Sequence, residues 1–250
     1  MMYTLMSSDR KNKDSIREHL ARLVISGELK TEDILPNEVA LADKFGVSRT
    51  LIRDVLRSLE EKGLIERKPQ VGTRPRNIQY WNLLDDEVLA WCCESMPQRR
   101  FYVSLLELRM VIEPQAAALA ATRANDEEIQ QIVNAFNRMT SKNQNGVMID
   151  SEGDIDFHQA IIKASGNIFI SQFGGIVRAA LYHTIYMSVR AATDHAESIE
   201  SHRLLLEAIE RRNPEQSYMA MSRVLSRTML DMGIEKASVI LPNQLKPAKE

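Results

Sequence analysis

Two amphipathic helical segments joined by a tight turn constrain the fold more than any other feature of this sequence. Residues 38–62 read EVALADKFGVSRTLIRDVLRSLEEK. Gly46 permits the turn, Val47 fills the hinge, and Ser48 suits the N-cap of the second helix. The second helix has one apolar stripe, formed by Leu51, Ile52, Val55, Leu56 and Leu59. We therefore expect a helix-turn-helix that buries this stripe and exposes the opposite face.

Arginines follow the exposed face of the second helix. A spacing of four residues places Arg49, Arg53 and Arg57 in one row, with Thr50 beside the first of them. Such a helix suits the major groove of DNA, where an arginine can bond guanine bidentately. For an isolated arginine row, a merely solvated face is the more common explanation. Here the row follows a helix-turn-helix and precedes a basic segment, and this combination favours DNA binding.

A short β-hairpin is expected directly after these helices. Helical periodicity stops between residues 64 and 78, where a Pro-Gln-Val-Gly turn separates two short segments. The hairpin carries four basic residues, which are Arg67, Lys68, Arg74 and Arg76. A further helix is expected over about residues 10–26. Together these elements predict a winged helix-turn-helix DNA-binding domain over residues 10–78.

The distribution of charge supports this domain. The whole chain of 250 residues is nearly neutral, with 32 Lys and Arg against 34 Asp and Glu. Residues 1–80, however, contain 15 basic and 12 acidic side chains, whereas residues 81–250 contain 17 and 22. The basic excess is greatest in residues 44–76, with 9 basic and 4 acidic side chains. A balanced average therefore conceals a basic N-terminal part and an acidic C-terminal part.

Helical sequence continues through the rest of the chain. Glycine and proline are few, and helix-forming residues such as Leu, Ala, Glu, Arg and Met are frequent. We expect a linker and junction helix in residues 79–99 and an all-α antiparallel helical bundle in residues 100–236. Residues 1–9 and 237–250 are expected to form a disordered N-terminus and a flexible C-terminus. The predicted fold class is therefore mainly α.

The sequence offers no candidate for a membrane span or a signal peptide. The longest stretch without a charged side chain, residues 164–177, has 14 residues and includes Ser, Asn, Gln and Gly. A spanning helix needs about 20 apolar residues. The first residues lack an apolar core of signal-peptide length. We therefore expect a cytoplasmic protein with no membrane partner.

One arginine interrupts an apolar helical stripe in the predicted bundle. In the segment SLLELRMVIEPQAAALAA this stripe consists of Leu105, Leu108, Ile112, Ala116 and Leu119. Arg109 lies within it, about 40° from Leu105 on a helical wheel. A buried guanidinium is costly unless it is paired. Its partner is either Glu113, one helical turn later, or a bound carboxylate, and the pattern leaves both possibilities open.

A carboxylate and two histidines also lie on apolar helix faces. Asp154 and His158 are four residues apart, and His158 shares its face with Ile161 and Ile162. His202 has a similar apolar setting. One such histidine is usually a satisfied core residue. A carboxylate with two imidazoles directed inward instead suits a divalent transition metal with open coordination positions, and spacing alone does not decide between the two.

The N-terminal run resembles the DNA-binding domain of the GntR family of bacterial transcription regulators. The resemblance rests on Leu35, Pro36, Glu38, Val47, Ser48, Arg49, Arg53, Leu56, Leu59, Gly63 and Leu64. It implies that Arg49 and Arg53 read the operator, with Thr50 nearby and Gly72 at the tip of the wing. Ser48 and Arg57 of the same helix complete the expected DNA-binding residues. The sequence departs from the family pattern at Asp33 and in the wing at Gln70, where glycine is usual.

The C-terminal part is similar to the FCD domain of the FadR branch of this family. The segments LRMVIEPQAAALAA, DIDFHQAIIKASGN and SHRLLLEAI carry the likeness. Many FCD domains hold Zn²⁺ or Ni²⁺ with one Asp and three His, and the metal helps to bind a carboxylate effector. The resemblance implies that Asp154, His158 and His202 are metal ligands that also contact the effector. It places Val224 at the position of the fourth ligand and assigns Arg109 to the effector carboxylate.

These expectations combine into a homodimeric DNA-binding transcription regulator that is not an enzyme. A dimer is expected because one recognition helix reads few base pairs and two-fold symmetry doubles the contacts. The expected regulator is a repressor that binds a small carboxylate effector. The junction sequence WNLLDDEVLAW resembles that of sugar-acid (galactonate-type) regulators, which favours a sugar acid as this effector. A competing hypothesis is a metal-dependent hydrolase-like helical domain fused to a DNA-binding module. A third is an architectural DNA-binding protein without an effector.

Overall fold

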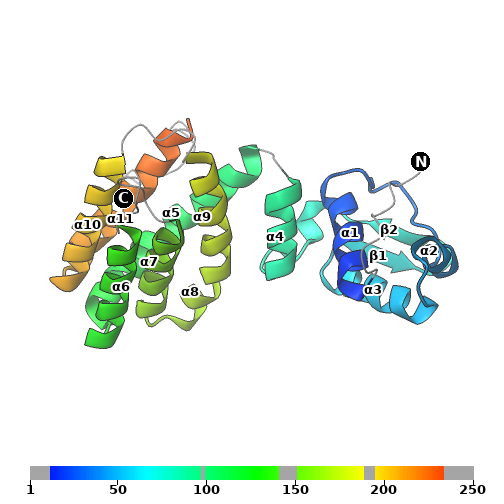
Figure 1. The fold of residues 1–250 in the computed structure, drawn as a ribbon, viewed down its shortest axis with the longest axis horizontal. Helices are drawn as coiled ribbons and strands as arrows, with labels where there is room; N and C mark the ends of the chain where they lie inside the picture. The colour runs from blue at the N-terminus through cyan, green and yellow to red at the C-terminus, as the bar shows by residue number, and fades with distance from the viewer. Residues whose placement is uncertain (1–11, 97–98, 141–150, 189–194, 234–250) are drawn as a thin grey trace, which may run out of the picture. The chain divides into compact units, whose positions relative to one another are not determined.

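The computed structural model describes residues 12–96, 99–140, 151–188 and 195–233. The chain forms two compact units, Met1–Pro97 and Gln98–Glu250. Helices dominate both, and the described residues contain one two-stranded sheet (Figure 1). The predicted mainly α fold, with a winged helix-turn-helix followed by a helical bundle, is therefore confirmed. The predicted terminal segments, residues 1–9 and 237–250, lie outside the described residues.

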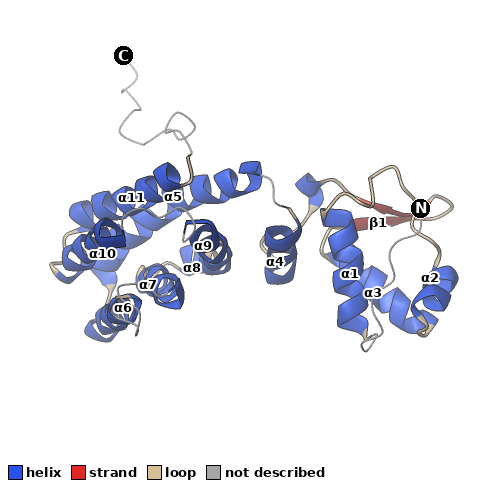
Figure 2. Cartoon of the chain, turned by 45° about the horizontal axis from the view of Figure 1, so that its top comes forward, coloured by secondary structure: helices blue, strands red, loops and turns tan. Residues whose placement is uncertain are grey.

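The N-terminal unit begins with the predicted helices and hairpin. Its elements are α1 (Lys13–Ile25), α2 (Glu38–Phe45), α3 (Arg49–Glu61), β1 (Ile65–Lys68), β2 (Gly72–Pro75) and the 3-10 helix η1 (Ile78–Tyr80). α2 ends at Gly46, whose φ of 67° lies in the left-handed region that glycine adopts readily. α3 begins after Ser48, whose side chain accepts a hydrogen bond from the Leu51 N–H. The turn chemistry expected of the helix-turn-helix is thus present, and Figure 2 shows α2 and α3 in the N-terminal unit.

The apolar faces of these helices pack together. α3 buries Ile52, Val55, Leu56 and Leu59, as the stripe predicted, and packs against α1. The fifth residue of the stripe, Leu51, is only half-buried. In α2, Val39 is 44% exposed. This short helix buries only Leu41, Ala42 and Phe45.

The predicted hairpin follows α3 directly. Its strands pair antiparallel, with Ile65 opposite Pro75 and Lys68 opposite Gly72. A single bridge between Leu35 and Thr73 connects the segment before α2 to the hairpin. β1 also packs against α3, so the wing and the second helix of the helix-turn-helix pack together.

The junction helix α4 (Asp86–Ser95) packs against α1 and is part of the N-terminal unit. Lys62, just after α3, lies 2.6 Å from an oxygen of Asp85 and 2.8 Å from one of Glu87. Arg17 of α1 lies 2.5 Å from the other carboxylate oxygen of Glu87. We call these contacts of Lys62, Asp85, Glu87 and Arg17 the α4 clasp. Partly buried ion pairs therefore attach the junction helix to the helix-turn-helix.

Helices alone form the described part of the C-terminal unit. They are α5 (Arg99–Arg123), α6 (Asp126–Met139), α7 (Ser151–Ala164), α8 (Ile168–Gln172), α9 (Gly174–Ser188), α10 (His195–Glu210) and α11 (Pro214–Asp231). α5 packs along α11, and α6 packs along α7 (Figure 1). The core between them includes Phe157 of α7, Leu205 of α10 and Leu225 of α11. None of the described helices is long and apolar enough to cross a membrane.

Residue type accounts for several helix ends in this unit. Asn125 caps α6 and Asn213 caps α11, each by accepting a backbone hydrogen bond. Gly166 follows α7 with a φ of 60°. The separation of α8 from α9 at Phe173 was not predicted, although the Gly174-Gly175 pair directly after it is a turn signal.

Gly153 lets α7 approach α6 very closely. A Cβ atom at this position would lie 2.5 Å from both the backbone nitrogen and the Cα of Met139. Real Cβ atoms do not come so near to backbone, so the two helices can meet in this way only at a glycine. The close contact fixes the first turn of α7, which carries Asp154.

Candidate functional site

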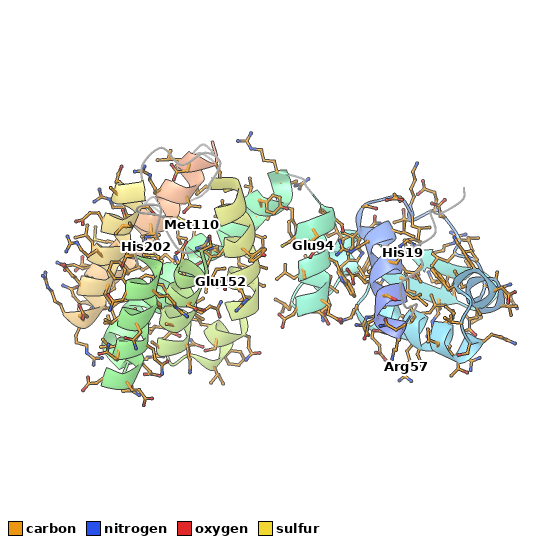
Figure 3. All side chains as sticks on the ribbon, in the orientation of Figure 1. His19, Arg57, Glu94, Met110, Glu152 and His202 are labelled. Atoms are coloured by element: carbon orange, nitrogen blue, oxygen red, sulfur yellow. The ribbon has the colours of Figure 1, made fainter. Side chains whose placement is uncertain are left out.

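α3 presents the predicted row of arginines to solvent. Arg49, Arg53 and Arg57 are exposed, as are Ser48 and Thr50 at the start of the helix. The helix therefore has a buried apolar face and an exposed basic face, with Arg57 on the outside in Figure 3. The structure brings these five predicted residues together, and their contacts with DNA stay a prediction.

Two of these arginines are held by carboxylates of the same unit. Arg53 contacts Glu38 of α2 at 3.4 Å, and Arg57 contacts Glu61 at 2.9 Å. Exposed ion pairs of this kind contribute only about 0.2–1 kcal/mol to the stability of the fold. A DNA phosphate or base edge can therefore replace the carboxylate at a small cost in free energy. The contact of Arg53 with Glu38 was not predicted, because it depends on the angle between two helices.

Several basic residues of the wing region contact other residues of the N-terminal unit. Arg67 pairs with Glu60 of α3 at 2.6 Å, and the guanidinium of Arg76 lies 4.0 Å from the ring centre of Tyr80. Gly72 begins β2 with a φ of 101°, and a Cβ there would lie 2.9 Å from a neighbouring side chain. The glycine is therefore required by the shape of the wing. Its contact with DNA stays a prediction.

A second candidate site lies inside the C-terminal unit. Asp154 and His158 come from α7 and His202 from α10, and their nearest ligand atoms lie within 4.8 Å of one another. The Nε2 atoms of His158 and His202 are 3.5 and 3.3 Å from Asp154 Oδ1. Both histidines are buried, and Figure 3 labels His202 in the interior of the unit. The three residues predicted as metal ligands therefore do come together.

Hydrogen bonds direct both imidazoles toward Asp154. The Nδ1–H of His202 donates to the Ser198 carbonyl at 2.8 Å, and Nδ1 of His158 contacts the carboxylate of Glu113. A ring that carries its proton on Nδ1 has its lone pair on Nε2. Histidine ligands in metal sites commonly donate their other N–H to a carboxylate or a carbonyl in this manner. Both Nε2 atoms are thus oriented as metal ligands.

The donor set fits a divalent transition metal. Apart from their mutual contact at 3.3 Å, Asp154 Oδ1 and His202 Nε2 are buried without a hydrogen-bond partner among the described residues, although buried polar atoms normally have one. One carboxylate oxygen and two imidazole nitrogens are ligands typical of Zn²⁺ and Ni²⁺. Within the described ranges, no other group of His, Cys, Asp and Glu side chains could hold a metal ion.

The carboxylates of this site are ionised at neutral pH. Burial alone would raise the pKa of Asp154, but the neighbouring imidazole of His202 outweighs burial, and that pKa is lowered to about 2. Burial also opposes ionisation of Glu113, whose pKa is nevertheless lowered to about 2 by Arg109 and His158. For His202, the effect of burial is overcome by Asp154, which raises the pKa of the imidazole above 6.5.

Arg109 lies in the same interior and is only 1% exposed. Its Nε pairs with the Glu113 carboxylate, so the ion pair that the sequence left open is present. Its Nη1 is buried and has no partner among the described residues. One edge of the guanidinium therefore retains donors for a carboxylate ligand, and binding of such a ligand stays a prediction.

Glu113 has a second contact that the sequence did not predict. Its spacing identified it only as a partner for Arg109, but it also contacts His158, 45 residues later. Packing of α5 against α7 creates this contact. An acidic residue within a buried helix segment is the only signal for it in the sequence.

Val224 occupies a buried position in α11 and packs in the apolar core. The metal-ligand group of the described residues therefore contains one carboxylate and two imidazoles. Val224, at the position where the resemblance placed a fourth ligand, has an apolar side chain that cannot bind a metal. A site with three protein ligands keeps coordination positions open for a bound molecule.

Comparisons with known proteins agree with this two-part organisation. Residues 12–74 match "Bacterial regulatory proteins, gntR family", and residues 104–227 match the FCD domain. The chain is 31% identical over 212 residues to the galactonate operon transcriptional repressor of Escherichia coli (strain K12), covering 83% of this chain and 90% of the relative. It is 29% identical over 211 residues to the HTH-type transcriptional regulator YieP of the same strain, covering 84% and 90%.

A solved structure supports the fold as a whole. Lar, which controls the expression of the Listeria monocytogenes agr system, matches with a TM-score of 0.57 at 16% identity. The match covers 90% of this chain and 98% of that chain. A sequence identity of 16% supports a shared fold but gives no information about a ligand.

Proposed function

Because this chain belongs to the GntR family of bacterial regulatory proteins and carries an FCD domain, we propose that it is a repressor whose operator binding is controlled by a small carboxylate, such as a sugar acid. It is a DNA-binding transcription regulator, and its relatives are regulators rather than enzymes, so the hydrolase hypothesis does not hold. The observation that carries the proposal is the buried group of Asp154, His158 and His202, linked through Glu113 to an incompletely paired Arg109.

On the DNA side, we assign the reading of bases to the exposed face of α3. Arg49 and Arg53 contact base edges, and Arg57 contacts phosphate. The small residues Ser48, Thr50 and Gly72 allow the helix and the wing to approach the DNA backbone. In a homodimer, two such helices read the two halves of a palindromic operator.

On the effector side, we assign binding to Arg109, Asp154, His158 and His202. The last three would hold a Zn²⁺ or Ni²⁺ ion, which when bound supplies a Lewis acid for an effector oxygen. Arg109 binds the effector carboxylate through the guanidinium edge that Glu113 does not occupy. The identity of 31% with the galactonate operon repressor supports both a sugar-acid effector and control by repression.

The proposal is tested by titrating the protein with aldonic and uronic acids, in a calorimeter and in mobility-shift assays with operator DNA. We expect one sugar acid to bind and to weaken operator binding by about 5- to 150-fold, which is a coupling of about 1–3 kcal/mol. A chelator should weaken binding of the effector. An architectural protein, the third hypothesis, would bind no sugar acid with or without chelator.

Arg109→Lys is the sharpest variant for this test. It keeps a positive charge beside Glu113 but cannot bond a carboxylate bidentately, so effector binding should lose about 1.5–3 kcal/mol. Operator binding without effector should be unchanged. The control is Arg211→Ala, which removes an exposed arginine that pairs with Glu207 at 3.4 Å. Equal effector affinity in Arg109→Lys and the wild type would contradict the assignment.

A further inference from the structure

Glu113 contacts two functional groups of the C-terminal unit at once. One carboxylate oxygen, Oε1, pairs with Nε of Arg109 on α5, and the other, Oε2, contacts Nδ1 of His158 on α7. All three side chains are at most 1% exposed. Water therefore does not compete for either contact, and both are stronger than the same contacts would be at the surface.

The contact with Glu113 decides which nitrogen of His158 faces Asp154. An ionised carboxylate only accepts hydrogen bonds, so the Nδ1 that faces it carries the proton and Nε2 keeps its lone pair. That Nε2 lies 3.5 Å from Asp154 Oδ1. His202 obtains the same arrangement independently, from the carbonyl of Ser198.

We propose that Glu113 is a positioning residue that holds His158 in the tautomer and orientation of a metal ligand. This inference rests on the proposed function, because it assumes that Asp154, His158 and His202 hold a metal. Arg109 contributes by engaging Oε1 of the same carboxylate, which leaves Oε2 for the imidazole. The side chain of residue 113 must therefore accept one hydrogen bond at each of its two terminal atoms, one from Arg109 and one from His158.

An amide of the same size cannot meet this requirement. In Glu113→Gln the amide oxygen remains the acceptor for Arg109, because the guanidinium offers only donors. The NH₂ group then faces Nδ1 of His158 and donates to it. The proton of the ring moves to Nε2, which loses its lone pair as a ligand, although the shape of the site is kept.

The test compares Glu113→Gln with Asp156→Asn in the full-length protein. Both variants remove one negative charge from the same unit, but Asp156 forms a surface ion pair with Arg138. Binding of Co²⁺, followed by its visible absorption, should weaken about 10- to 100-fold in Glu113→Gln, the effect usual for loss of a hydrogen-bond partner of a histidine ligand. It should keep the wild-type value in Asp156→Asn.

Nitrogen-15 NMR of the metal-free protein gives an independent readout. We expect His158 to carry its proton on Nδ1 in the wild type and on Nε2 in Glu113→Gln. A purely structural role for Glu113 would leave this tautomer unchanged. Wild-type Co²⁺ affinity in folded Glu113→Gln, or an unchanged tautomer, would overturn the proposal.

A second variant covers the case in which Glu113→Gln does not fold. Arg109→Met/Glu113→Leu removes both charges of the buried pair, a replacement that proteins often tolerate, and it leaves Nδ1 of His158 without its acceptor. The same loss of Co²⁺ affinity is expected, and wild-type affinity would again overturn the proposal. A wild-type protein that binds no Co²⁺ would overturn the proposed metal site together with this inference, which distinguishes that failure from the failure of Glu113 alone.

Discussion

At the scale of single residues, the C-terminal unit places several charged groups in an apolar interior. Burying ions costs more free energy than their pairing commonly returns, so buried ion pairs are weak evidence for stability. Arg109 and Glu113 are nevertheless fully buried, next to residues that leave polar atoms without partners. Perturbed and incompletely paired groups of this kind gather at functional sites, which is why we interpret them as an effector site.

The sequence could identify the members of this site but not all of their contacts. Arg109, Asp154, His158 and His202 each interrupt an apolar helical stripe, and that is a local pattern. The contact of Glu113 with His158 instead depends on how α5 packs against α7. Pairwise geometry between helices has no signature in a single sequence.

The arginine at the first position of α3 gives a prediction at this scale. Arg49→Ala should weaken operator binding by about 1–3 kcal/mol and relax the preference for one base, if Arg49 bonds guanine bidentately. Mobility-shift titrations with the operator and with single-base variants measure both effects. Arg57→Ala serves as the comparison, because loss of a phosphate contact weakens binding to all sequences alike. Unchanged operator affinity in Arg49→Ala would rule out its assigned role.

At the scale of helices and strands, local sequence determined most of what is observed. Gly46 and Ser48 form the turn of the helix-turn-helix, and Asn125 and Asn213 cap their helices, all as expected from their residue types. The close approach of α6 and α7 was not predicted, since Gly153 within a helical segment reads only as a weak helix former. The need for glycine at position 153 becomes apparent only from the position of α6 in the structure.

Gly153 provides the test of that approach. Glycine to alanine within a helix ordinarily stabilises by about 0.5–1 kcal/mol. At Gly153 the added Cβ would lie 2.5 Å from the backbone of Met139, so we expect net destabilisation of about 1–3 kcal/mol as the helices separate. Thermal unfolding measures the change. Gly174→Ala is the matched control, because its nearest neighbour is the flexible end of Gln159 at 3.1 Å, and equal melting temperatures for the two variants would refute the steric argument.

The junction helix gives a prediction about pH. Burial raises the pKa of Asp85, but the hydrogen bond from Lys62 outweighs burial and lowers the pKa below 3.8. A carboxyl group with a lowered pKa in the folded state stabilises the fold above its unfolded pKa, and the contribution is lost as the pH falls through the folded pKa. Asp85→Asn keeps a good N-cap but should cost up to about 1 kcal/mol at pH 7.

The difference between Asp85→Asn and the wild type should shrink as the pH falls below 3.8, where the wild-type carboxyl group also becomes neutral. Urea unfolding of both proteins at neutral and acidic pH measures it. Asp54→Asn, an exposed substitution on α3, controls for general charge effects. A difference that stayed constant with pH would mean that the charge of Asp85 has no part in the stability of this unit.

At the scale of the whole molecule, residues 1–80 carry a net positive charge and residues 81–250 a net negative charge, and together they give a chain that is almost neutral. The excess of positive charge lies in the recognition helix and the wing, and most of the excess of negative charge lies in the junction segment, where Asp85, Asp86, Glu87 and Glu94 stand without a basic residue among them. The positive charge that attracts the phosphate backbone is therefore concentrated in residues 44–76, which form the recognition helix and the wing.

This division predicts different responses to salt for the two binding activities. Operator affinity should fall steeply as salt increases, because phosphate contacts release counterions. Effector affinity should change little, because Arg109 and its neighbours are buried and buried charges are weakly screened. Titrations of both ligands at about 50 and 200 mM salt measure the two slopes. Equal slopes would contradict the separation of the two sites.

The α4 clasp has a consequence for exchanging modules between regulators. A chimera that replaced everything after residue 78 would discard Asp85 and Glu87 and leave Lys62, whose side chain is 11% exposed, without either carboxylate. A crossover placed after Ser95 would carry the whole clasp into the new protein. Recombination in the laboratory or in a genome should therefore yield working hybrids when the crossover lies beyond α4, and unstable ones when it lies between the wing and this helix.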